Sequence, residues 1–183
     1  MSAEDRLERL WTPYRMSYVR GEEADSGVAE ADACPFCRIA AGGAQSGGAQ
    51  SGGAQSGLVV HRGATAFVVL NLYPYNPGHL MVVPDRHVAD YTDLDAAETA
   101  EVATLTQRAL TTLRAVSQPH GFNVGLNLGG VAGGSLSQHL HQHVVPRWSG
   151  DANFMTVIGQ TKTLPQLLED TRDLLAAAWP QED

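Results

Sequence analysis

The stretch Gln138-His139-Leu140-His141-Gln142-His143-Val144-Val145-Pro146-Arg147 decides the fold, because alternating histidines run into core-like valines. Residues two apart on a strand share one face of a sheet. The spacing therefore predicts a strand from about Gln138 to Val145, with His139, His141 and His143 projecting from one face. Burying three imidazoles unpaired is costly, so we expect them to be hydrated, metal-bound or catalytic.

The residues around this predicted strand favour chemistry at phosphorus. A neutral imidazole keeps a free lone pair at pH 7, which makes it a good nucleophile. The glycine-rich loop at 129–134 comes just before the histidines, and glycines let backbone N–H groups approach anionic oxygens closely. Such a loop alone is often only a long turn, but next to alternating histidines it indicates a phosphate-binding site.

The strongest periodic patterns lie in residues 58–179, which we expect to form one α+β domain. Short apolar runs predict strands over Leu58–Val60, Ala66–Leu70, Leu80–Val83 and Phe122–Leu128. A helix is predicted over about 93–116, with Val102, Leu105, Ala109, Leu113 and Val116 on its apolar face. A last helix is predicted from about Thr163 to Pro180, burying Leu164, Leu167, Leu168, Leu174 and Leu175.

The N-terminal part differs in character from this domain. Residues 1–33 hold an aromatic, apolar stretch followed by an acidic one, and we expect them to pack on the body or on a partner subunit. Residues 34–41 contain a Cys-x₂-Cys knuckle. Residues 42–57 are three copies of GGAQS followed by Gly57, which predicts a flexible surface loop. A partner-binding loop is the alternative.

Composition excludes several classes of protein. Twelve basic and 20 acidic residues give a net charge of −8, which disfavours binding to nucleic acid. No run of apolar residues is long enough for a transmembrane helix, so we expect no membrane partner. The acidic N-terminus lacks an export signal, and two cysteines cannot build a disulfide scaffold, so we expect a cytoplasmic protein.

The histidine stretch also resembles a known family. Residues 139–145 are similar to the motif of the histidine-triad (HIT) superfamily, His-φ-His-φ-His-φ-φ with φ apolar, departing from it at Gln142. Residues 71–84, NLYPYNPGHLMVVP, resemble the second signature of the family. Residues 10–16, 122–127 and 146–154 resemble the actinobacterial diadenosine tetraphosphate (AP4A) phosphorylase branch. The resemblance implies a HIT-like fold, an antiparallel sheet with two main helices.

This resemblance implies an enzyme in which His141 attacks the α-phosphorus and becomes adenylylated, with His139 and His143 as the other catalytic histidines. Inorganic phosphate then accepts the AMP, so that diadenosine tetraphosphate yields ATP and ADP. A hydrolase of dinucleoside polyphosphates or nucleoside phosphoramidates, with water as acceptor, is the alternative, and a non-enzymatic binding module is a third possibility. The implied substrate-binding residues are Asn71, His79, Asn127, Gly134, Ser135, Gln138 and Trp148.

Several of these residues have simpler interpretations. Asn71 and Asn127 could only cap turns, Ser135 could bond within its loop, and Trp148 could be core or a dimer contact. The Cys34–Cys37 spacing suits tetrahedral zinc, and the resemblance supplies His87 and His139 as the other ligands of a structural zinc. A reduced, metal-free pair is the alternative. The resemblance further implies a homo-oligomer, and magnesium would relieve repulsion between the acidic chain and its substrate.

Overall fold

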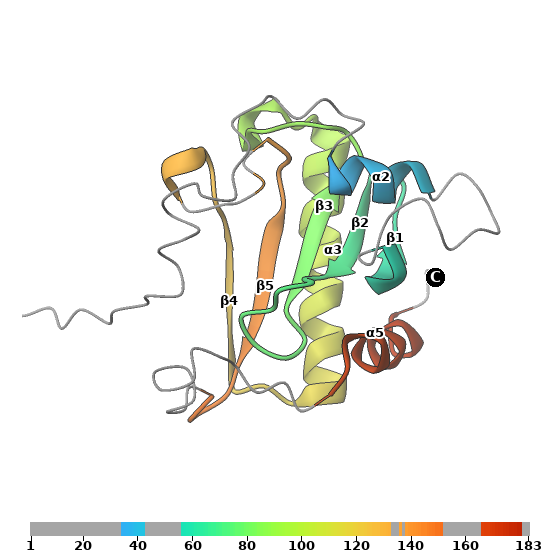
Figure 1. Ribbon diagram of the computed structural model, residues 1–183, viewed down its shortest axis with the longest axis vertical. Coiled ribbons are helices and arrows are strands. Elements are labelled where there is room, and N and C mark those ends of the chain that lie inside the picture. The colour runs from blue at the N-terminus through green and yellow to red at the C-terminus, as the bar shows by residue number, and fades with distance from the viewer. Residues whose placement is uncertain (1–33, 43–55, 133–135, 137, 152–165, 181–183) are drawn as a thin grey trace, which may run out of the picture.

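The computed structural model describes residues 34–42, 56–132, 136, 138–151 and 166–180, and its centre is a five-stranded antiparallel sheet (Figure 1). The strand order is β1-β2-β3-β5-β4, so β1 and β4 form the two edges. The strands are β1 Val59–Arg62, β2 Ala66–Leu70, β3 Leu80–Pro84, β4 Gly121–Leu126 and β5 Gln142–Arg147. The predicted antiparallel α+β fold is confirmed.

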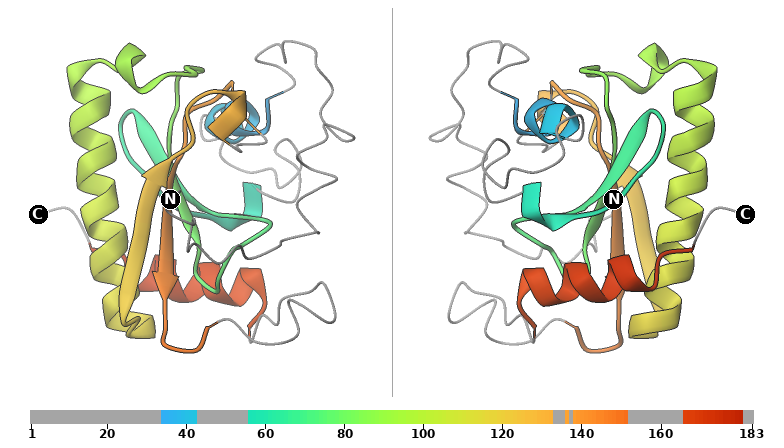
Figure 2. Two further views of the ribbon diagram at one scale, coloured as in Figure 1. Left: turned by 90° about the vertical axis from the view of Figure 1, so that its left-hand side faces the viewer. Right: turned by 90° about the vertical axis from the view of Figure 1, so that its right-hand side faces the viewer.

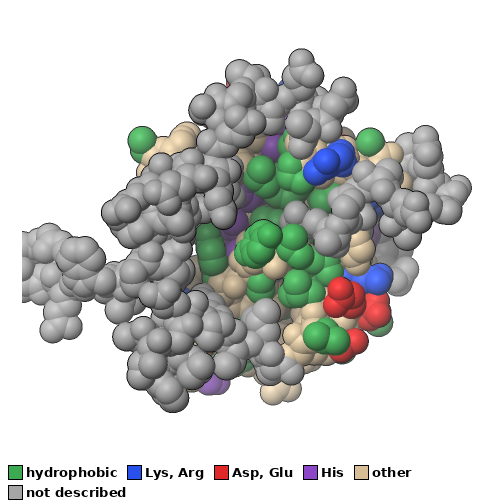
Figure 3. All heavy atoms as spheres, viewed as in Figure 1, with side chains coloured by type: hydrophobic (Ala, Val, Ile, Leu, Met, Phe, Trp, Pro, Cys, Tyr) green, Lys and Arg blue, Asp and Glu red, His purple; other side chains and the backbone are tan. Residues whose placement is uncertain are grey.

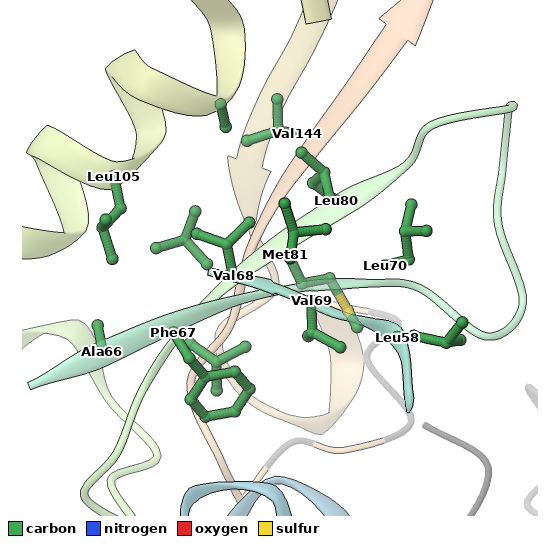
Figure 4. Packing of buried hydrophobic residues seen from close by; sticks show 14 of the residues in the cluster. Leu58, Ala66, Phe67, Val68, Val69, Leu70, Leu80, Met81, Leu105 and Val144 are labelled. Carbon is green, nitrogen blue, oxygen red and sulfur yellow. The ribbon is translucent and has the colours of Figure 1, made fainter. Parts of the chain in front are cut away.

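The middle of the sheet is apolar on both faces. All five residues of β2 and all five of β3 are buried, and the strands pair in continuous register from Ala66↔Pro84 to Leu70↔Leu80. Successive side chains alternate between the faces. Figure 4 shows Val68 directed toward Leu105 of the long helix, with Phe67 and Val69 on the opposite side of β2. The uninterrupted apolar runs in the sequence arise from this two-sided burial.

The long helix α3, Ala96–Ser117, covers one face of the sheet. It begins at a capping box, because the Asp95 carboxylate accepts from the Glu98 N–H while the Glu98 side chain accepts from the Asp95 N–H. Thr92 lies just before the helix, in the 3₁₀ turn Tyr91–Asp93. Four of the five predicted face residues are buried: Val102, Leu105, Ala109 and Leu113.

Two shorter helices complete the described structure. The helix α5, Leu168–Ala177, packs against β1 and α3, and Leu175 is its buried residue. Leu167 and Leu174 are exposed, so the prediction that they are buried was wrong; the helix starts after Leu167 and turns Leu174 outward. The helix α2, Pro35–Gly42, was missed, because eight residues around two cysteines give little periodic signal. Figure 2 shows α2 and α3 on opposite sides of the sheet.

Of the predicted repeat loop at 42–57, the structure describes only the two ends. Gly42 closes α2 and Ser56–Leu58 form a 3₁₀ turn, so the repeat loop contributes these described ends. Residues 1–33 and the rest of that loop lie outside the described residues, as do Leu164 and the predicted start of the last helix. Within the described ranges, every helix is too short or too polar to cross a lipid bilayer.

Candidate active site and metal site

The three histidines do not share one strand face as predicted. The strand β5 begins at Gln142, so His139 and His141 precede it. The segment before β5 instead docks on the chain that follows β3: the Leu140 N–H donates to the Val88 carbonyl at 2.6 Å. This docking turns the His139 side chain toward the cysteines, while His141 and His143 stay neighbours with ring centroids 4.9 Å apart.

His141 is anchored by a backbone carbonyl. Its Nδ1 lies 2.8 Å from the carbonyl oxygen of His139, and because a carbonyl only accepts, Nδ1 carries the proton and donates it. Burial lowers the pKa of His141 below 6.5, partly offset by this hydrogen bond, so the ring is neutral at pH 7. A neutral imidazole protonated at Nδ1 has its lone pair at Nε2, so the structure gives His141 the electronic state of a nucleophile.

His143 has the opposite tautomer, set by His79. The Tyr75 backbone N–H donates to His79 Nδ1 at 3.1 Å, so a neutral His79 ring carries its proton on Nε2. This Nε2 lies 2.9 Å from His143 Nδ1 and donates to it. His143 therefore holds its own proton on Nε2. Burial first, and then repulsion from the charge that His141 carries when it is protonated, lower the pKa of His143 to about 4, so His143 is neutral at pH 7.

Two predicted substrate-binding asparagines lie beside these histidines. The Asn127 amide is 3.5 Å from His143 Nε2, at the end of β4. The Asn71 amide nitrogen is 3.3 Å from His79 Nδ1, while its oxygen accepts from the Tyr73 N–H at 2.9 Å. Asn71 thus caps its own turn, which was the simpler interpretation, yet it also borders the histidine pair.

The histidines lie on the sheet face opposite α3. Gln142, between them, points the other way and donates to the Thr106 hydroxyl of α3 at 2.7 Å. This contact explains how a polar residue occupies a position that is apolar in the motif. On the face away from α3, histidine side chains reach the surface near the centre of Figure 3. The site therefore has one buried wall and one open side.

The four predicted metal ligands come together. Cys34, Cys37, His87 and His139 place one ligand atom each within 4.8 Å of the others. His139 Nδ1 lies 3.4 Å from the Cys34 sulfur and 3.5 Å from the Cys37 sulfur, and His87 Nδ1 lies 3.1 Å from the Cys37 sulfur. Tetrahedral zinc separates sulfur and nitrogen ligands by about 3.5 Å, so these residues fit zinc.

The surroundings of this cluster also suit a metal. His139 is 1% exposed, and burial lowers its pKa to about 4, so it is in the neutral form that a ligand requires. Its other ring nitrogen lies 2.9 Å from the Pro84 carbonyl, an arrangement that fixes the tautomer of a metal-binding histidine. Both cysteines are free of disulfides.

Of the remaining predicted residues that the structure describes, Trp148 is not brought to the histidines. Gln138 is exposed in a turn before His139. Trp148 lies beyond the far end of β5, about 16 Å along the strand from His143, and its indole N–H donates to the Ser117 carbonyl. Gly134 and Ser135 lie outside the described residues.

Two aromatic residues that the sequence analysis missed belong to the site. The Tyr75 ring lies over His79 and His143, at centroid distances of 4.7 and 5.8 Å. The Phe36 ring contacts His139 and His141, at 5.4 and 5.2 Å. Tyr75 lies within the second signature, and Phe36 stands between the two cysteines, so each had a positional signal.

Comparison with known proteins bears on this geometry. The HIT domain family matches residues 54–150 of the chain. The AP-4-A phosphorylase of Mycobacterium tuberculosis is 53% identical over 180 residues, covering 97% of this chain and 87% of that protein. The asymmetrical bis(5'-nucleosyl)-tetraphosphatase of Schizosaccharomyces pombe is 30% identical over 93 residues, covering 51% of this chain and 50% of that protein.

One solved structure with this fold contains zinc. A zinc-bound histidine triad family protein from Mycobacterium smegmatis superposes with a TM-score of 0.61 at 28% identity. The match covers 81% of this chain and 94% of that protein. A hypothetical histidine triad nucleotide-binding protein from Sulfolobus tokodaii superposes with a TM-score of 0.60 at 23% identity, covering 79% of this chain and 91% of that protein, which shows the fold.

Proposed function

The chain belongs to the histidine-triad (HIT) family, and we propose that it is an AP4A phosphorylase, converting diadenosine tetraphosphate and inorganic phosphate into ATP and ADP. The observation that carries the proposal is the pair of neighbouring histidines with opposite tautomers: His141 presents a lone pair and His143 an N–H. The choice of phosphate as acceptor is supported by the similarity, over nearly the whole chain, to a protein of that name.

In the first half-reaction, the lone pair on His141 Nε2 attacks the α-phosphorus of the substrate. The bond from that phosphorus to the oxygen bridging to the β-phosphate breaks, and ATP leaves with the electron pair. The His143 Nε2–H donates to a non-bridging oxygen, where negative charge increases in the transition state. The product on the enzyme is an adenylyl group bonded to His141.

In the second half-reaction, an oxygen of inorganic phosphate attacks the adenylyl phosphorus. The N–P bond breaks, its electron pair returns to His141 Nε2, and ADP leaves while the proton of the phosphate is released. A water molecule at the same position would give AMP instead, which is the hydrolase alternative. The nature of the acceptor is therefore what separates the two enzymes.

Binding of the substrate is assigned to groups around this pair. We assign ribose to Asn71 and a phosphate or ribose contact to Asn127, which borders His143 at 3.5 Å. Phosphate oxygens are assigned to Gln138 and to the loop that carries Gly134 and Ser135. Because both the chain and its substrates are anionic, we also propose that the polyphosphate arrives with magnesium.

We assign structural zinc to the four-residue cluster of Cys34, Cys37, His87 and His139. Zinc supplies no redox chemistry; when bound, it fixes the geometry of its four ligands. This assignment is supported by the ligand distances and by the zinc-bound relative. Thiolate ligands need a reducing environment, which agrees with the cytoplasmic location that we propose.

We further propose that two copies of the chain associate through β4. This strand is a sheet edge, and Asn123, Val124 and Gly125 in its middle are exposed. Val124 is 46% exposed, and an open edge offers unpaired backbone groups to a second strand. The experiment is size measurement in solution: Val124→Lys should shift a dimer toward monomer, and a monomeric parent protein would refute this assembly.

The experiment that tests the activity uses diadenosine tetraphosphate and ³²P-labelled inorganic phosphate. We expect the label to appear in ADP and not in ATP, and we expect His141→Ala to abolish turnover. Without phosphate, a burst of about one ATP per chain should accompany an AMP-sized mass gain on His141. Phosphate-independent release of AMP would instead establish the hydrolase, and the absence of any product would leave a binding module.

A further inference from the structure

We propose that the Cys-x₂-Cys segment is a positioning device for the nucleophile: Phe36 holds the His141 ring by direct contact, and the metal cluster holds it through the His139 carbonyl. This inference rests on the proposed function, in which His141 is the nucleophile. It assigns Phe36 and His139 as positioning residues and links the metal site to the rate of adenylyl transfer. A purely structural metal site would affect only the stability of the fold.

The first link runs through His139, which is held on three sides. Its Nδ1 faces both cysteine sulfurs at 3.4 and 3.5 Å, its Nε2 lies 2.9 Å from the Pro84 carbonyl, and its own carbonyl accepts from His141 Nδ1. Since His139 precedes β5, strand pairing does not fix this carbonyl. The direction of the carbonyl therefore depends on two anchors: the Leu140 N–H of the same peptide, which donates to the Val88 carbonyl, and the His139 side chain.

The second link is the Phe36 ring. Phe36 is fully buried and lies in α2 between Cys34 and Cys37. Its ring centroid is 5.2 Å from that of His141, with the rings inclined at 48°, and 5.4 Å from that of His139. One hydrogen bond at Nδ1 leaves the imidazole able to swing about that bond. A buried aromatic ring against its side removes much of that freedom.

Both links start from the same short segment, so the metal and Phe36 act together. Binding of both cysteines to a metal would fix the first turn of α2 and, with it, the ring of Phe36. Misplacement of a reacting atom by about 1 Å costs on the order of 100-fold in rate. The binding of AMP depends on other groups, among them Asn71 and Asn127, so affinity should change little when the nucleophile is misaimed.

The test compares Phe36→Leu with Phe67→Leu. Phe67 contacts Phe36, which in turn contacts His141, so the same substitution is made one residue further from the nucleophile. Phe67 is equally buried and its ring centroid is 6.4 Å from that of Phe36, so both variants lose similar packing. We expect Phe36→Leu to slow single-turnover formation of adenylyl-His141 by about tenfold or more, with AMP affinity within about twofold. Phe67→Leu should keep the rate within about twofold of the parent protein.

A second readout reports on the ring itself. Imidazole ¹⁵N shifts of His141 should indicate a single Nδ1–H tautomer in the metal-loaded protein and exchange broadening after removal of the metal by a chelator. Zinc content and melting temperature are measured for every sample, and Cys37→Ser repeats the metal loss without chelator. Phe36→Leu should broaden the His141 signals, whereas Phe67→Leu should leave them sharp.

The outcomes separate this inference from the proposed function. If the parent protein forms no adenylyl-His141, the proposed function fails. If it does, and Phe36→Leu and Phe67→Leu slow the reaction equally, the positioning role is overturned while the function stands. If the metal-free protein stays folded and its His141 signals and reaction rate are unchanged, the proposed effect of the metal cluster on His141 is overturned. If the metal-free protein unfolds, the positioning role is decided by the comparison of Phe36→Leu with Phe67→Leu.

Discussion

Replacing His79 by phenylalanine tests the tautomer assignment most directly. The ring keeps its approximate shape, but both nitrogens are lost, so the Tyr75 N–H loses its acceptor and His143 Nδ1 loses its donor. His143 is then free to take the other tautomer, with its proton on Nδ1. In that state a lone pair, and not an N–H, would face the phosphate oxygens.

The magnitude follows from the two hydrogen bonds, of 3.1 and 2.9 Å. Each contributes about 1 kcal/mol net, and a buried donor left unsatisfied costs about 1 to 3 kcal/mol. We expect the free energy of unfolding to fall by about 1 to 3 kcal/mol. Loss of the oriented His143 donor should raise the activation barrier by about 1 to 2 kcal/mol, which is about 5- to 30-fold in kcat.

The assay separates the two bonds with amide variants. His79→Gln retains a donor near the Nε2 position and should recover most of kcat, whereas His79→Asn retains an acceptor for Tyr75 and should recover mainly stability. His120→Phe, at an exposed histidine bonded to Ser149, is the control for loss of an imidazole. If folded His79→Phe keeps kcat within about twofold, His79 does not orient His143 and the reasoning is refuted.

Three further outcomes follow from single contacts. Because burial lowers the pKa of both His141 and His143 below the ordinary value of 6.5, both rings stay neutral at that pH, and single-turnover rates should show no acid limb there; an acid limb at 6.5 would contradict this. Gly78 has φ of +74° and its added Cβ would lie 3.1 Å from Leu113, so urea titration should show Gly78→Ala destabilised by about 1 to 2 kcal/mol. Gln142→Leu removes one bond to Thr106, which still donates to the helix backbone, so stability and kcat should change by less than about 1 kcal/mol.

The fold was largely predictable from the sequence because burial and periodicity coincide in its centre. The runs Ala66–Leu70 and Leu80–Val83 are apolar throughout, and both became central strands covered on two faces. The α3 pattern was equally clear, since Val102 and Leu105 face the sheet at helical spacing. The edges gave weaker signals: Leu174 is apolar yet 42% exposed, and no periodicity distinguishes it from a core leucine.

The site was predictable in its residue types but not in its backbone. Alternating histidines predict a strand, because side chains on a strand repeat every two residues. The tertiary contact from Leu140 to Val88 outweighed that local preference and separated His139 from the other two histidines. Tautomers are beyond any sequence pattern, because a tautomer is set by the partner that each ring nitrogen meets in space.

The three histidines have different roles because each is held by a different group. His139 faces the cysteines, His141 donates to a carbonyl, and His143 accepts from His79. Two neighbouring imidazoles two residues apart would otherwise have no reason to differ in which nitrogen carries the proton. Because their anchors lie on separate parts of the chain, one ring is held as a nucleophile and its neighbour as a donor at the same pH. A variant that keeps all three histidines but exchanges the tautomers of His141 and His143 should therefore be as inactive as a variant that lacks His141.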